Sequence, residues 1–194
     1  MSKNVSKKEK VRRLVLGAVL SALVVVLQLL GSFIHLGPFS VSLVLVPIVI
    51  GAATCGKGIG AWLGFVFGVV VILSGDAAAF MSVSVVGTII TVLAKGTLCG
   101  LAAGLVYSLL QKRNQYLAVA AAAVVCPLVN TGVFLLGCVA FFLKTIAEWG
   151  AAEGFSNVIG YMFLGLAGGN FLFELVINIV LSPAIIRVIN YKDK

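Results

Sequence analysis

Six runs of apolar residues, separated by short polar turns, occupy almost the whole chain. Hydrophobic residues make up 61% of the 194 residues and charged residues only 10%, and the mean hydropathy is +1.20. A soluble domain of this length could not bury so many apolar side chains. The composition therefore predicts an all-α, polytopic membrane protein built as a bundle of six transmembrane helices.

The apolar runs fall at residues 14–34, 40–54, 59–73, 83–110, 117–143 and 158–190. The second run is short and contains Pro47, so we expect it to be tilted, kinked or incompletely spanning. The third run carries Gly60, Gly64 and Gly68 at a spacing of four, which favours close packing against another helix. Residues 144–157 are polar and are expected to form the longest loop between spans.

The distribution of charge predicts how the chain is oriented. All but two of the 14 Lys and Arg residues lie in the amino-terminal segment, the second and fourth loops and the carboxyl-terminal region, whereas Asp76, Glu148 and Glu153 lie in the other loops. By the positive-inside rule, both termini are expected in the cytoplasm. No basic surface continues into the rest of the chain, so the basic head is interpreted as a topology signal beside the lipid bilayer, and no nucleic-acid partner is expected. The predicted division is a basic cytoplasmic segment at 1–13, a membrane domain at 14–190 and a cytoplasmic tail at 191–194.

Lys95 lies near the middle of the fourth run, where an ammonium in lipid would cost roughly 2.5–3.5 kcal/mol. It should therefore face the protein interior or a wet cavity. Counted from the outer helix ends, Asn130 and Glu174 lie within roughly 6 Å of the same depth, so the three could converge in one cavity. Two alternatives stay open: contact with a ligand, or a structural Lys95–Glu174 pair with Asn130 as a bonded neighbour. Asn170 and Asn178 lie four residues to either side of Glu174 and share its helix face.

Some polar and aromatic residues near the outer boundary are weaker candidates. His35 is the only histidine, and an ordinary solvated turn residue is favoured there over a ligand contact. Trp149 and Tyr161 suit membrane-interface anchors, although an aromatic platform for a ring-shaped solute would look the same. Gln28 in the first run is a weak candidate of the same kind.

The motifs of common enzyme chemistry are missing. The sequence has no HExxH, no GxSxG and no Walker-type phosphate loop, and its single histidine restricts acid–base chemistry. The cysteines share no CxxC or Cys/His spacing and are interpreted as small packing residues: Cys55, Cys99, Cys126 and Cys138. We therefore expect a protein that carries a solute or binds a partner, not an enzyme, with no cofactor and no metal site.

Several stretches, taken in order, resemble one membrane protein family along essentially the whole chain. They are the basic head, LGAVLSA at 16–22, PIVIG at 47–51, GKGIGAWLG at 56–64 and KGTLCGLAAG at 95–104. The family is the substrate-binding S components of energy-coupling factor (ECF) transporters, and the last stretch resembles the fourth helix of its folate, pantothenate and riboflavin group. Ala18 and Ala22 match the small-residue motif with which the family docks on the transmembrane coupling subunit.

The resemblance implies an importer subunit in the cell membrane, expected to be a bacterial plasma membrane. A pocket formed mainly by helices four to six would open outward and take up a water-soluble vitamin or related molecule. Delivery inward would need the coupling subunit and two ATPase subunits. A stand-alone secondary transporter or channel, and a membrane scaffold without a solute, remain as alternatives. The substrate-binding candidates in this pocket are Lys95, Asn130, Asn170 and Glu174. The possible lid or rim residues are His35, Asp76 and Trp149.

Overall fold

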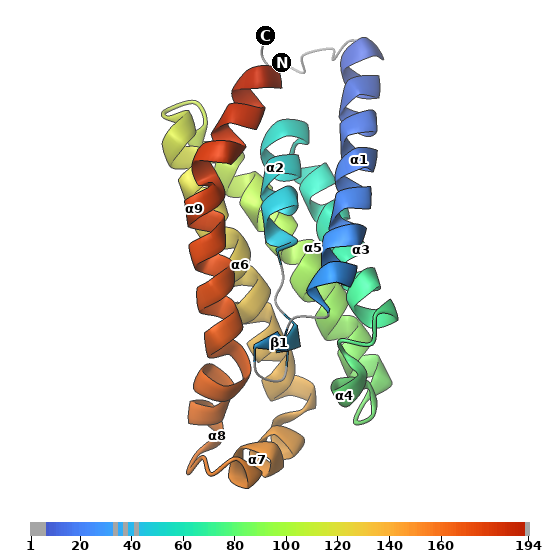
Figure 1. The fold of residues 1–194 in the computed structure, drawn as a ribbon, viewed down its shortest axis with the longest axis vertical. Helices are drawn as coiled ribbons and strands as arrows, with labels where there is room; N and C mark the ends of the chain where they lie inside the picture. Colours follow the sequence, from blue (N-terminus) through green and yellow to red (C-terminus); the bar gives the residue numbers. More distant parts are fainter. Residues whose placement is uncertain (1–6, 33–34, 37–38, 41–42, 193–194) are drawn as a thin grey trace.

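Long helices run between two ends of the molecule in the computed structural model, which describes residues 7–32, 35–36, 39–40 and 43–192 (Figure 1). In chain order the elements are α1 (Lys7–Gly31), β1 (His35–Leu36), β2 (Phe39–Ser40), α2 (Leu45–Cys55), α3 (Lys57–Leu73), α4 (Ala78–Met81), α5 (Val85–Leu110), α6 (Gln115–Phe141), α7 (Leu143–Ala152), α8 (Val158–Gly160), the π-helix η1 (Tyr161–Gly168) and α9 (Gly169–Lys192). Apart from the small antiparallel hairpin of β1 and β2, all regular secondary structure in the described residues is helical, which confirms the predicted all-α class.

Four helical segments in the described residues are long and apolar enough to cross a membrane: Lys7–Gly31, Val85–Leu110, Gln115–Phe141 and Val158–Arg187. Two of the predicted spans are shorter helices. α3 has 17 residues and α2 only 11, which correspond to about 25 Å and about 16 Å, against a hydrocarbon core of about 30 Å.

The two ends of the bundle differ in what they carry (Figure 1). At the terminal end lie the start of α1, the junction of α2 and α3, the turn between α5 and α6, and the end of α9. At the opposite end, here called the hairpin end, lie β1, α4, α7 and α8. The basic residues Lys57 and Arg113 therefore belong to the terminal end, and the acidic residues Asp76 and Glu148 to the hairpin end.

Local chemistry explains where several helices begin. The side chains of Ser84, Asn114 and Asn157 accept hydrogen bonds from backbone N–H groups in the first turns of α5, α6 and α8. Each such bond satisfies a donor that has no partner within the helix. Gly56 alone joins α2 to α3, and its φ of 98° is one that glycine adopts without a steric penalty. Pro47 lies in the first turn of α2, where its missing N–H costs no helical hydrogen bond.

Some expected boundaries were wrong. The predicted loop at 144–157 is largely the helix α7, whose Ile146 and Gly150, spaced by four, are buried while Glu148 is exposed. α1 begins well before residue 14, within the basic segment, because lysine and arginine are good helix formers. The last apolar run is not one α-helix: the π-helix η1 precedes α9, which extends to Lys192.

α3 and α5 pack with their backbones in direct contact. A Cβ atom on Gly64 would collide with the carbonyl oxygen of Gly96, and one on Gly96 with the carbonyl oxygen of Gly64. Gly60 and Gly100 stand in the same reciprocal relation one turn away. The predicted packing role of the glycine face of α3 is confirmed, and its partner is a second glycine face on α5.

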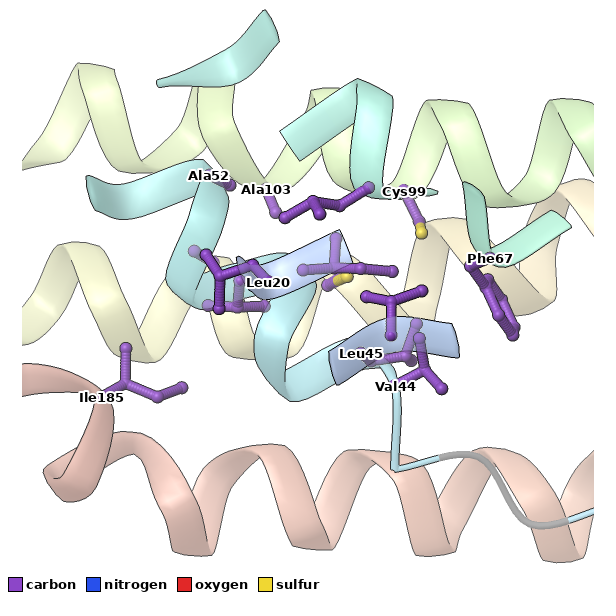
Figure 2. Packing of buried hydrophobic residues seen from close by; sticks show 14 of the residues in the cluster. Leu20, Val44, Leu45, Ala52, Phe67, Cys99, Ala103 and Ile185 are labelled. Atoms are coloured by element: carbon purple, nitrogen blue, oxygen red, sulfur yellow. The ribbon is translucent and has the colours of Figure 1, made fainter. Parts of the chain in front are cut away.

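α2 lies at the centre of the terminal half of the bundle. Val44, Leu45, Ile48 and Val49 have no exposed surface. Figure 2 shows side chains of α1, α3, α5 and α9 gathered around this short helix, among them Leu20. The terminal half is therefore filled by apolar packing.

Replacing Gly64 by alanine tests the contact between α3 and α5. Gly64→Ala should lower the free energy of unfolding by about 1–3 kcal/mol, because the added methyl group has to push two backbones apart. Gly58→Ala in the same helix is the matched control, since its Cβ would meet no atom within 4 Å. Thermal unfolding in detergent measures both, and equal melting temperatures for the two variants would contradict the packing argument.

Candidate functional site

A cavity of about 80 Å³ lies in the half of the bundle near the hairpin end. The described residues that line it are Gln28 of α1; Phe67 and Val71 of α3; Asp76 and Ala77 of the following turn; Phe80 of α4; Thr88, Thr91, Val92 and Lys95 of α5; Asn130, Thr131 and Phe134 of α6; Phe142 between α6 and α7; Leu166 and Ala167 of η1; and Asn170 and Glu174 of α9. No described residue of α2 lines it. Because α2 is only 11 residues long, its apolar packing ends before this level and leaves room for the cavity.

All four predicted substrate-binding residues line this one cavity. Lys95 comes from α5, Asn130 from α6, and Asn170 and Glu174 from α9. Asn170 and Glu174 share one face of α9 because they are four residues apart. The structure thus brings together side chains that are up to 79 positions apart in the sequence.

Lys95 is held by aromatic rings. Its Nζ lies 5.7 Å from the ring centroid of Phe67 and 5.3 Å from that of Phe134, which are cation–π distances. No salt bridge joins Lys95 to Glu174 in the described part of the chain. The directly paired Lys95–Glu174 alternative is therefore not what this structure contains, and both charged groups face the cavity.

Glu174 is anchored by an amide. Its side chain is 6% exposed, and its Oε2 accepts a hydrogen bond from Asn130 Nδ2 at 3.4 Å. Asn130 is 5% exposed, so this contact between α6 and α9 is shielded from solvent. Asn178, in contrast, donates its Nδ2 to the backbone carbonyl of Glu174 and is not among the cavity residues.

A second amide–carboxylate contact links α1 to the turn after α3. Gln28 is 1% exposed and donates its Nε2 to Asp76 Oδ2. Asp76, expected at a lid or rim, thus lies in the cavity wall, beside a residue that had been only a weak candidate. The signal for Gln28 was its position, since it continues the buried face of α1 that includes Leu20 and Val24.

Two threonines of α5 were missed at the sequence level. Thr88 and Thr91 precede Lys95 by seven and four residues and line the same cavity. That spacing places all three on one helix face, so helical periodicity around Lys95 could have identified them.

The other predicted site residues lie elsewhere. Trp149 does not line the cavity, and its ring packs edge-on against Phe80, with the centroids 5.4 Å apart. The prediction for His35 depends on its side chain, which lies outside the described residues. Ala18 and Ala22 lie on the exposed face of α1, opposite the face that contains Gln28.

The comparison with known families decides the class of the protein. The family model for the substrate-specific component of ECF transporters matches residues 12–186. The chain belongs to this family. No curated protein and no solved structure matches the chain.

Family membership gives this S component its general role. Substrate-specific components are transporter subunits and not enzymes, so the protein is a subunit of a transporter. Together with its apolar helices, membership also identifies a multi-pass membrane protein.

The stability of a Lys95→Met variant distinguishes a binding residue from a structural one. Because Lys95 forms no salt bridge with Glu174, the S component should keep its free energy of unfolding within about 1 kcal/mol, or gain stability. Thermal unfolding in detergent without added solute is the measurement, with the exposed Lys57→Met as control. A loss of about 3–5 kcal/mol, the size expected when a buried ion pair is broken, would show instead that Lys95 is structural.

Proposed function

We propose that this S component captures a water-soluble vitamin, or a related small molecule, outside the cell and delivers it inward with a coupling subunit and two ATPase subunits. The observation that carries the proposal is the cavity around Lys95. Lys95 forms no salt bridge among the described residues. A buried ammonium without a direct carboxylate partner is costly to keep, and a solute that binds it would offset the cost.

The proposed orientation places six helices across the membrane and both termini in the cytoplasm. Support comes from the separation of charge between the two ends, because Lys57 and Arg113 share the terminal end with the basic start of α1. With this orientation the cavity lies in the outer half of the bundle, where a solute arriving from outside would first meet it. The apolar packing around α2 then closes the cytoplasmic half.

The cavity walls suit recognition more than chemical conversion. Half of the described lining residues are apolar or aromatic, and the polar side chains among them would fix the orientation of a solute. The cavity contains one lysine and two carboxylates that already accept amide hydrogen bonds. This arrangement suits the binding of a solute, and the described lining places no activated nucleophile beside it.

We assign partner docking to the face of α1 that points away from the helix bundle. Ala18 and Ala22 are exposed there at a spacing of four, and small side chains at that spacing let another helix approach closely. On the opposite face of the same helix, Gln28 lines the cavity. The proposed sequence of events is that solute binding orders the outer loops, α1 docks on the coupling subunit, and ATP hydrolysis reorients the bundle to release the solute inside.

Native mass spectrometry of gently purified protein tests the proposed solute binding. The expected spectrum contains the protein with one vitamin-sized molecule, which fragmentation would identify. A spectrum of unliganded protein, followed by no binding across a panel of water-soluble vitamins in calorimetry, would contradict the proposed function.

Bulky substitutions on α1 test the docking face separately. Ala18→Trp and Ala22→Trp should each prevent co-purification with the coupling and ATPase subunits of the same organism, because an indole fills the space for a neighbouring helix. Affinity for the solute should not change, since both positions face away from the cavity. Ala120→Trp, at an exposed alanine of α6 near the terminal end, is the matched control and should assemble normally. Normal assembly of both α1 variants would rule out this face.

A further inference from the structure

Two amide–carboxylate contacts in the cavity wall fix the orientation of the amides. Gln28 Nε2 donates to Asp76, and Asn130 Nδ2 donates to Glu174. An ionised carboxylate can only accept hydrogen bonds, so each amide has to present its NH₂ group to the carboxylate. The oxygen of each amide is then directed elsewhere.

Those two amide oxygens have no partner among the described residues. Gln28 Oε1 and Asn130 Oδ1 are buried, and no donor in the described part of the chain reaches them. Asn170 Oδ1 and Thr91 Oγ1 are also buried without a described hydrogen-bond partner, and all four residues line the cavity. A buried acceptor without a donor is unfavourable. Because these residues come from four different helices and line one cavity, a ligand that supplies donors would satisfy several of the oxygens at once.

Lys95 has hydrogen-bond donors that lack acceptors. Its ammonium carries three N–H donors, whereas the rings of Phe67 and Phe134 attract the charge but provide no conventional hydrogen-bond acceptor. In the described part of the chain, Lys95 also forms no salt bridge with Glu174. Asp76 and Glu174 line the same cavity but accept amide hydrogen bonds, so an anionic group on the ligand would supply the direct counter-ion and the acceptors that Lys95 lacks among the described residues.

We infer that the solute of this site is a small organic anion whose apolar body also carries N–H or O–H donors. Its acidic group binds Lys95, and its donors bind the free oxygens of Gln28 and Asn130, which makes Gln28 a substrate-contact residue. The pattern disfavours organic cations, neutral compounds and carboxylates without donors. This inference rests on the proposed solute-binding function and narrows it to one chemical class.

A panel of six vitamins tests the inference by calorimetry on the purified full chain. Pantothenate, folate and biotin are anions with donors, riboflavin is neutral, thiamine is a cation, and nicotinate is an anion without donors. Binding is expected within the first three only. Tighter binding of riboflavin, thiamine or nicotinate than of all three would overturn the inference and leave the proposed function standing. Binding of none of the six would contradict both.

Variants then test each half of the pattern with the vitamin that binds. Lys95→Gln should weaken its binding by about 10- to 100-fold, the range for a hydrogen bond to a charged group. The carboxamide derivative of the same vitamin should bind both proteins equally, because it has no charge for Lys95 to attract. An equal loss for the acid and the amide would overturn the assignment of the anionic group to Lys95.

Gln28→Leu tests the other half. It should weaken binding by about 2- to 10-fold, the range for a neutral hydrogen bond. Asn178→Leu is the matched control, because Asn178 Oδ1 is also buried and unpartnered but lies away from the cavity. Should Gln28→Leu not fold, methylation of the donor groups of the vitamin makes the same test on the native protein. Unchanged affinity in either experiment would overturn the donor part of the inference.

Discussion

The direct contact between the backbones of α3 and α5 determines the position of the other important groups. Gly64 meets Gly96, and Gly96 follows Lys95 directly in the chain. Phe67 lies one turn beyond Gly64 on α3, so the same contact brings its ring to the ammonium of Lys95. Larger side chains at the glycines would hold the helices apart and would take the ring away from the charge. The environment of Lys95 therefore depends on residues that have no polar atoms in their side chains.

The two halves of the bundle follow different physical rules. Around α2, the apolar side chains are fully buried and fill the space between the helices, as expected where stability is the requirement. Around Lys95, a cavity is surrounded by a charge and by several acceptors that have no donor in the described part of the chain, which lowers stability. Departures from close packing and from complete hydrogen bonding concentrate at functional sites. The contrast supports the proposal that the hairpin half is shaped by binding, whereas the terminal half is shaped by packing.

Much of the fold and of the candidate site could be predicted from the sequence, for identifiable reasons. Lys95, Asn130 and Glu174 could be placed at one depth because a helix rises by a constant amount per residue. Trp149 was expected at the rim, but it packs behind Phe80 because the predicted loop around it is the helix α7. The depth of Glu174 was estimated by assuming that the last run is a regular α-helix, whereas a π-helix precedes Asn170. Local irregularity of this kind depends on contacts between elements, which periodicity does not describe.

The sequence by itself determined that the chain belongs in a membrane. It also identified the glycine face of α3, the polar face of α9 and the few polar residues that need an explanation. These properties follow from composition and from spacing along one helix. Only the tertiary structure decided the partners: Lys95 lies between two rings and not against Glu174, and Gln28 meets Asp76 across 48 positions. It also decided that α2 begins only at Leu45, partway along the bundle, which leaves room for the cavity. Partner choice depends on how helices rotate and tilt against one another, and that is set by packing between elements distant in sequence.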